Sequence, residues 1–312
     1  MIPTPPAQVQ EAPTSRDIPF LGFGDVPLGG TVLPGKGSPW FAVLVADSGP
    51  LDRDWSDPRL PAHGGRIMAD WLQEQGLGSF RFDKRMAHSR DPHLNTSLDA
   101  QTGDIRAAIQ TAKGLPEAKG KRILLVGHGE GAMLGLLAGK EADAFLLLAM
   151  PPQPMAKAIL DEVALQLPPE KAGINLAYLR SVFQAIRDGK PGPRPDPEVY
   201  PALARLGASL MAPETLAFVK ETLDLDPMAM AYRTAVPIAL VWGEKDIQAS
   251  LPQDIPSTFH GTVLDIKDAN HLLRTETRPR TGLDGKTALE GYRDERPLAD
   301  LSAVADWIRE LR

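Results

Sequence analysis

A glycine-dense turn between a strand pattern and a helix pattern has the clearest chemical meaning in this sequence. Residues 124–133 read LLVGHGEGAM, a buried-strand pattern followed by a helix that begins near Ala132. A sharp strand-to-helix turn of the form G-x-S-x-G exposes its central serine at the top of a sheet, in a strained conformation. The central residue here is Gly129, which has no side chain that could attack a substrate. The turn therefore predicts the scaffold of a covalent-catalysis site whose nucleophile position is vacant.

The same turn also satisfies a nucleotide-binding pattern. Gly127, Gly129 and Ala132 match G-x-G-x-x-G/A, in which the glycines let the backbone approach a pyrophosphate. That motif requires an acidic residue at the end of the next strand, where Met150-Pro151 stands instead. It also belongs on the first strand, whereas this turn lies in the middle of the chain. The sequence therefore argues against a nicotinamide-dependent enzyme, and no other cofactor is implied.

Composition excludes several further classes of site. The chain of 312 residues has no cysteine, so disulfides, thiolate metal sites and a cysteine nucleophile are excluded. A net charge of −6 without a Lys/Arg cluster argues against nucleic-acid binding. His63, His88 and His93 have no paired carboxylate at metal-ligand spacing, so no metal site is expected.

The sequence patterns also bear on membranes and targeting. No apolar run approaches the roughly 18 residues that a membrane-spanning helix needs, so no span is predicted. Residues 1–17 are polar, proline-rich and aperiodic, and we interpret them as an arm. Their opening lacks the basic start and the apolar stretch of a signal peptide, so a cytoplasmic protein is expected.

The elements that must position this turn alternate along the chain. The runs WFAVLVA, RILLVG and AFLLLA are apolar without alternation, which is typical of strands buried on both faces of a parallel sheet. Helix patterns between them cover 64–75, 97–113 and 298–311. Such alternation predicts a doubly wound α/β sheet. Eight strands are expected, at Ile18–Gly22, Thr31–Pro34, Trp40–Ala46, Ser79–Asp83, Arg122–Gly127, Ala144–Ala149, Pro237–Trp242 and Thr262–Ile266.

The alternation stops at residues 151–233, which carry helix patterns and no strand pattern. Proline-rich joints separate four or five helices there, and because proline fixes φ and cannot continue a helix, the joints are stiff corners. Strand patterns resume at Pro237, which favours a helical cap over a separate domain with its own partner. We therefore expect a core of 1–150 and 234–312, interrupted by a cap at 151–233.

Four further motifs, together with the turn, resemble the α/β-hydrolases of the serine aminopeptidase/carboxylesterase kind. The resemblance covers about residues 40–311 and implies that family's fold, a mostly parallel sheet of about eight strands with helices on both faces. It rests on an oxyanion-hole loop usually written GSGPxDRD, a strand with a DKR turn, a strand ending at an acid, and a histidine loop. These motifs are Asp47-Ser48-Gly49-Pro50-Leu51-Asp52-Arg53-Asp54, Phe80-Arg81-Phe82-Asp83-Lys84-Arg85, Val241-Trp242-Gly243-Glu244-Lys245-Asp246-Ile247-Gln248 and Asp268-Ala269-Asn270-His271.

The resemblance implies a role for each site residue. Gly129 would occupy the nucleophile position, Asp246 would orient His271, and His271 would act as the base. The backbone N–H groups of Ser48 and Glu130 would form the oxyanion hole. Around them we expect Asp47, Arg53 and His128, and Asp47 brings a carboxylate close to that hole where many relatives carry glycine.

The resemblance also implies an activity, the hydrolysis of carboxylic esters of short acyl groups, with a small apolar ester as the partner. Gly129 closes the covalent serine route. It could be a natural substitution, an engineered one, or part of an enzyme that uses the Asp246–His271 dyad without a covalent intermediate. A non-catalytic binding protein that keeps the pocket is the second class of function. These alternatives stay open at the level of the sequence.

Overall fold

A single eight-stranded sheet is the centre of the structure, a computed structural model that describes residues 14–89, 91, 93–293 and 296–311. The strand order is β1-β2-β4-β3-β5-β6-β7-β8. The pairs β1/β2 and β2/β4 are antiparallel, and every later pair is parallel, so the predicted mostly parallel sheet is confirmed. The strands are β1 (Arg16–Leu21), β2 (Pro27–Leu33), β3 (Trp40–Val45), β4 (Gly78–Phe82), β5 (Arg122–His128), β6 (Ala144–Leu148), β7 (Ile238–Gly243) and β8 (Thr262–Ile266).

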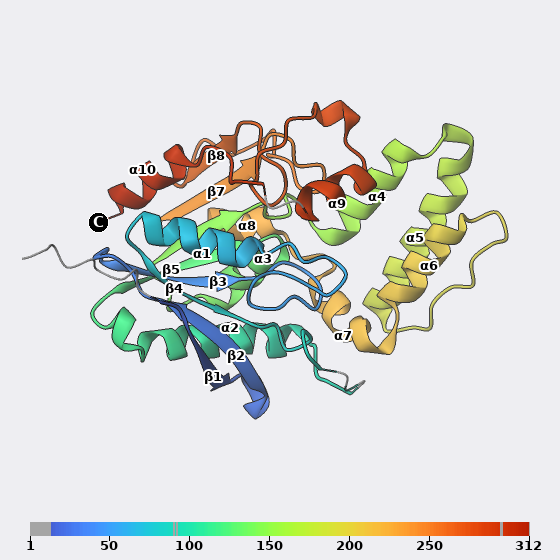
Figure 1. The fold of residues 1–312 in the computed structure, drawn as a ribbon. Coiled ribbons are helices and arrows are strands. Elements are labelled where there is room, and N and C mark those ends of the chain that lie inside the picture. The colour runs from blue at the N-terminus through green and yellow to red at the C-terminus, as the bar shows by residue number, and fades with distance from the viewer. Residues whose placement is uncertain (1–13, 90, 92, 294–295, 312) are drawn as a thin grey trace, which may run out of the picture.

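Both faces of the sheet are covered by helices, as the unbroken apolar strand runs predict. On β3, Phe41 and Val43 face one apolar cluster while Ala42 and Leu44 face another. The first cluster is shared with α2 (Leu98–Lys113), α3 (Glu130–Ala138) and α8 (Pro227–Tyr232). The second is shared with α1 (Gly64–Glu74) and α10 (Ser302–Glu310), which lie on the other side of the sheet (Figure 1). The central strands are therefore held rigidly, and their carboxyl ends can fix loops in place.

The predicted elements agree with the structure except at a few ends. All eight strands and the helices at 64–75 and 97–113 are found within a few residues of their expected bounds. The last helix begins at Ser302 rather than at 298, because Leu298 forms a bridge with Arg274 and Ala299 donates its N–H to Leu273 (2.9 Å). The expected arm of residues 1–17 ends earlier, since β1 starts at Arg16, and its first 13 residues lie outside the described part of the chain.

Five helices lie between β6 and β7 in the described residues, and no strand lies among them. Proline is the first residue of four of them, where its missing N–H costs nothing and its fixed φ suits a helix. Most of this segment lies beyond one end of the sheet (Figure 1). It has its own apolar cluster around Leu179, Phe183 and Leu223. Its helices are α4 (Met155–Gln166), α5 (Pro169–Asp188), α6 (Pro201–Leu210), α7 (Pro213–Thr222) and α8.

These features agree with a cap, although the domain boundaries themselves stay a prediction. Two hydrogen bonds join α7 to the start of α2: Thr96 donates to the Glu214 carbonyl (2.8 Å), and the Leu98 N–H donates to Glu221 (3.0 Å). One further helix, α9 (Gly285–Arg293), lies between β8 and α10, where the sequence predicted no element. Among the helices described, none is by itself long and apolar enough to cross a membrane; only the sharply bent pair α6–α7 meets that test, by length and composition alone.

Candidate active site

The turn after β5 has the geometry of a nucleophile elbow. Gly129 is the one residue between β5 and α3, with φ 54° and ψ −123°, a backbone conformation that glycine adopts at little cost. Its N–H donates to the Leu148 carbonyl of β6 (2.9 Å), which fixes the turn against the neighbouring strand. Gly131 faces the Ala46 carbonyl so closely that a Cβ atom would overlap it. Glycine is therefore required at 129 by the backbone conformation and at 131 by close packing against β3.

The carboxylate of Asp47 fills the space above Gly129. Asp47 follows β3, and its Oδ1 accepts hydrogen bonds from the backbone N–H groups of Ser48 (2.6 Å) and Glu130 (2.7 Å). A Cβ atom at position 129 would overlap all three atoms of that carboxyl group. The two N–H groups predicted as an oxyanion hole thus converge on one oxygen, and that oxygen belongs to Asp47.

Asp246 and His271 form a buried pair beside this carboxylate. Asp246 lies in the loop after β7, where its Oδ1 accepts the N–H groups of Gln248 (2.7 Å) and Ala249 (3.1 Å). Its Oδ2 is 2.7 Å from His271 Nδ1, and His271 Nε2 is 3.1 Å from Asp47 Oδ2. The three side chains therefore form a continuous chain of hydrogen bonds from Asp246 through His271 to Asp47.

This arrangement sets the charges of the site. Burial alone would lower the pKa of His271, but Asp246, and after it Asp47, outweigh burial and raise the pKa to about 10. Burial alone would raise the pKa of Asp47, but the hydrogen bond from His271, the charge on His271 and the backbone N–H of Glu130 hold it well below its ordinary value. At neutral pH the site therefore holds an imidazolium between two carboxylates.

His128 is the buried neighbour of His271. Its ring stacks on Trp55 (centroids 5.1 Å apart) and meets the His271 ring edge-on (4.7 Å). Since the His271 carbonyl can only accept, its 2.8 Å contact with His128 Nε2 places a hydrogen on that nitrogen. The other nitrogen, Nδ1, is buried without a hydrogen-bond partner, 3.7 Å from Asp47 Oδ2. Burial, and then the charge on His271, lower the pKa of His128, which stays neutral.

The same three residues could in principle hold a metal ion. One ligand atom each of Asp47, His128 and His271 lies within 4.8 Å of the others. The sequence predicted no metal site, and the fold brings these residues together from the loop after β3, the last position of β5 and the loop after β8. An ion bound there would have to replace the hydrogen bond between His271 Nε2 and Asp47 Oδ2.

A cavity of about 280 Å³ opens onto Asp47, Gly129 and His271. Side chains of the inserted helices line much of it, including Met155 and Ile159 of α4. Met155 and Glu130 also line a second, more apolar cavity of about 370 Å³, which reaches Phe218 of α7. A small, partly apolar substrate would fit against the Asp47–His271 pair.

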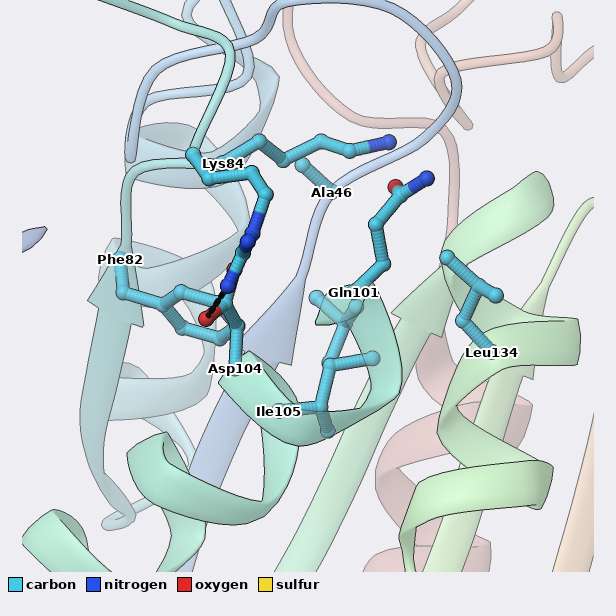
Figure 2. A pocket seen from close by; sticks show the side chains of 9 residues that line it. Ala46, Phe82, Lys84, Gln101, Asp104, Ile105 and Leu134 are labelled. Carbon is cyan, nitrogen blue, oxygen red and sulfur yellow. Dashed lines mark hydrogen bonds and ion pairs between the residues drawn. The ribbon is translucent and has the colours of Figure 1, made fainter. Parts of the chain in front are cut away.

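Lys84 joins the loop after β3 to the start of α3. Its Nζ donates to the Asp47 carbonyl (2.8 Å) and to Glu130 Oε1 (3.0 Å). Figure 2 shows Lys84 extending past Ala46, above a pocket of only about 20 Å³ that Phe82, Gln101 and Leu134 help to line. That pocket is too small for a substrate. The cavity over Gly129 is the candidate site because Asp47, Gly129 and His271 line it.

The structure brings most of the residues expected at the site close together, while their roles stay predictions. These are Gly129, Asp246 and His271, the N–H groups of Ser48 and Glu130, and the side chains of Asp47 and His128.

Arg53 is the exception. It binds Asp83 (2.7 Å) and the Gly30 carbonyl (2.9 Å), and none of its described contacts reaches the site, because β2 and β4 supply its partners. Tyr292 was not predicted near the site at all. It accepts a hydrogen bond from Gln248 (2.6 Å) and comes from α9, the helix that the sequence did not reveal.

Comparisons with known proteins concern the fold and the sequence of the whole chain. No family model matches the chain. Esterase EstD of Thermotoga maritima is 26% identical over 259 residues, which are 78% of this chain and 57% of the relative. The chain thus spans little more than half the length of that curated relative. The solved structure of the Pyrococcus furiosus esterase PF2001 has a TM-score of 0.54 at 15% identity, covering 96% of this chain and 91% of that one. The α/β hydrolase GrgF from Penicillium sp. sh18 has the same TM-score and identity, covering 96% and 99%.

Proposed function

We infer, from the premise that this chain is an α/β-hydrolase by fold and esterase-like by sequence, that it is a hydrolase working without a serine nucleophile. In this proposal the carboxylate of Asp47 stands where the serine hydroxyl of such esterases would stand. The observation that carries it is the position of that carboxylate, with one oxygen on the N–H groups of Ser48 and Glu130 and the other on His271.

Covalent serine chemistry is closed in this site. An acyl-enzyme intermediate requires a hydroxyl or thiol at the elbow, and residue 129 offers only hydrogen. The acid–base part of the site is nevertheless complete, because Asp246 holds His271 Nδ1 and leaves Nε2 facing the cavity. A histidine so held can exchange a proton with a substrate, a leaving group or water.

The proposed substrate is a small, largely apolar molecule. Relatives named as esterases suggest a carboxylic ester, and the cavity size agrees with a short acyl group. A narrow specificity would come from α4, whose Met155 and Ile159 line the cavity. No residue of this proposal requires a cofactor.

A non-catalytic binding protein is the second candidate. It is favoured by one observation: Asp47 already satisfies both backbone donors and His271, so the polar groups of the site need no substrate to complete them. Such a protein would bind a ligand in the cavity and leave it unchanged.

Turnover of p-nitrophenyl acetate and butyrate at large substrate excess separates the two candidates. The proposed hydrolase gives multiple turnovers that His271→Ala abolishes and that His260→Ala, at an exposed histidine between β7 and β8, leaves unchanged. A flat progress curve with both esters, together with saturable ligand binding, would remove carboxylic esters as substrates and favour the binding protein.

A further inference from the structure

The two oxygens of the Asp47 carboxylate have different surroundings. Oδ1 is held by the N–H groups of Ser48 and Glu130, at 2.6 and 2.7 Å. Oδ2 accepts no backbone hydrogen bond in the described contacts and faces His271 Nε2 at 3.1 Å. The side chain is about one-fifth exposed and lines the 280 Å³ cavity. One oxygen is therefore anchored, and the other is directed at the acid–base residue.

The anchored oxygen decides which electrophile the site can accept. Attack on an ester carbonyl places negative charge on the substrate's carbonyl oxygen, which needs the oxyanion-hole donors. Here Asp47 Oδ1 occupies both donors. Displacement at a saturated carbon places no charge on a carbonyl oxygen, so it needs no such donors. The resting site is thus organised for an alkyl rather than an acyl electrophile.

We propose that Asp47 is a carboxylate nucleophile that attacks a saturated carbon of a small epoxide or alkyl halide and forms a covalent ester through Oδ2. This rests on the proposed function, a hydrolase without serine, and for the same site it replaces the carboxylic ester suggested by the relatives with an alkyl electrophile as the substrate class. Glycine at 129 is then the residue that makes room for the nucleophile, since any Cβ there would overlap the Asp47 carboxyl group.

In the first step Asp47 Oδ2 forms a bond to the substrate carbon. With an epoxide, the ring C–O bond breaks and its electron pair stays on oxygen, which takes the proton from His271 Nε2. With an alkyl halide, the carbon–halogen bond breaks and the halide leaves with the electron pair. Asp47 becomes a neutral ester, so His271 loses one of the two carboxylates that favoured its charge, and its pKa falls. After halide displacement this fall releases its proton to solvent.

In the second step the neutral His271, held by Asp246, takes a proton from water, and the hydroxide adds to Asp47 Cγ. Negative charge develops on Oδ1, which already lies on the N–H groups of Ser48 and Glu130. The bond from Cγ to the alkyl oxygen then breaks, and that oxygen takes the proton back from His271 and leaves as an alcohol. Asp47 is left as a carboxylic acid and passes its proton to His271, which restores the starting charges. The oxyanion-hole donors thus stabilise the negative charge that forms on the enzyme's own Asp47 ester.

Oxygen transfer from Asp47 to product gives the direct test. The protein is incubated in oxygen-18 water with 1,2-epoxybutane or 1-bromobutane over many turnovers and is then digested with trypsin. Residues 37–53 form one tryptic peptide, which contains Asp47 and also Asp52 as an internal control. The proposal expects heavy oxygen in Asp47 and none in Asp52, with no label in protein incubated without substrate.

Trapping of the intermediate gives a second arm that does not depend on turnover. In His271→Gln the second step lacks its base, whereas displacement of bromide needs no proton. Intact mass after incubation with 1-bromobutane should then show one butyl group per chain, located on Asp47, and none in the Asp47→Asn/His271→Gln double variant.

The outcomes separate this proposal from the one it rests on. Turnover of the epoxide or bromide without label in Asp47 would overturn the nucleophile and leave a hydrolase that activates water directly. His271-dependent turnover of p-nitrophenyl esters with neither label nor butyl adduct would overturn the nucleophile in the same way. Absence of turnover, label and adduct with all of these probes would overturn both proposals.

Discussion

The two halves of the candidate site depart from the esterase pattern to different degrees. The half built after β7 and β8 keeps the Asp246–His271 pair, with the acid fully buried and 2.7 Å from the ring. The half built after β3 and β5 differs at Asp47 and at Gly129. These two departures fit one another, since the carboxyl group of one fills the space that the other leaves open. In the proposed function these two residues together relocate the functional group of the site, and exchanging both residues tests this.

Exchanging both residues should have the largest effect. Asp47→Gly together with Gly129→Ser would empty the oxyanion hole and place a hydroxyl above His271. Because Asp246 and His271 are unchanged, we expect a gain of at least about a hundredfold in p-nitrophenyl butyrate turnover, with a burst of acyl-enzyme. Stopped-flow release of p-nitrophenol measures both. A silent but correctly folded double variant would show that the first half of the site never supported serine chemistry.

Gly129→Ser alone should lose stability and gain no activity. The new Cβ would overlap the Asp47 carboxyl group, and a residue other than glycine would have to adopt φ 54°. Overpacking and backbone strain each cost roughly 1–3 kcal/mol. The free energy of unfolding, measured by urea titration, should therefore fall more in this variant than in the double variant. Equal values would mean that Asp47 turns aside at no cost.

The pH dependence of the free energy of unfolding should report the positive charge on His271, which lies between Asp246 and Asp47. The pKa of His271 is raised from 6.5 to about 10, so its contribution to stability is complete below pH 6.5 and is lost as pH rises to about 10. Four ionisable groups face it: Asp47, Asp246, His128 and Tyr292. His128 stays neutral, and burial raises the pKa of Tyr292, so neither titrates in this interval.

Asp47→Asn removes one of the two carboxylates, so it should lower the pKa of His271 and reduce this loss of stability. Urea titrations across the interval measure the slope in both proteins. Slopes that do not differ would show that Asp47 does not interact with His271 in solution.

Glu130→Gln should have the smallest effect. The site uses the backbone N–H of Glu130, while its carboxylate pairs with the buried Lys84 side chain (3.0 Å). Glutamine removes the charge but keeps an oxygen that can accept from Lys84 Nζ, so a charge-assisted hydrogen bond becomes a neutral-acceptor one at a cost of about 1–2 kcal/mol. We therefore expect turnover within about threefold of wild type and a stability loss of about 1–2 kcal/mol. Steady-state kinetics that show a much larger loss would give the carboxylate a direct role.

The fold could be predicted almost completely from the sequence, because the apolar pattern within each short segment indicates which element it forms. Strands buried on both faces, such as β3 and β5, carry unbroken apolar runs that little else in a chain of this length can explain. The helix α9 was missed because its nine residues, GKTALEGYR, hold few apolar side chains and two glycines, although Asp284 before it caps the helix by accepting the Thr287 N–H (2.8 Å). Short amphipathic helices of that kind are stabilised by tertiary packing, here through Ala288 and Tyr292.

The site could be predicted only in part. Motif order placed Gly129, Asp246 and His271, but the direction of the Asp47 side chain depends on backbone geometry that a sequence does not display. The same holds for Arg53. Its place in the motif predicted a position near the site, but its guanidinium binds Asp83 and the Gly30 carbonyl instead. One feature of the sequence could have predicted the position of the Asp47 side chain. Gly129 has no side chain, and β3, which ends just before Asp47, is the strand next to β5, so the Asp47 carboxylate can fill the space above Gly129.

The protonation state of His271 shows whether the Asp47 carboxylate stands above Gly129 in solution. Nitrogen-15 NMR of the imidazole distinguishes a ring protonated on both nitrogens from a neutral one. With Asp47 and Asp246 on its two sides, His271 should be doubly protonated at neutral pH and titrate near the value of about 10 that the geometry gives. Asp47→Asn should move that titration to lower pH. A wild-type His271 that is neutral at pH 8 and titrates near 6.5 would mean that the carboxylate lies elsewhere, and the proposed role of Asp47 would fail with it.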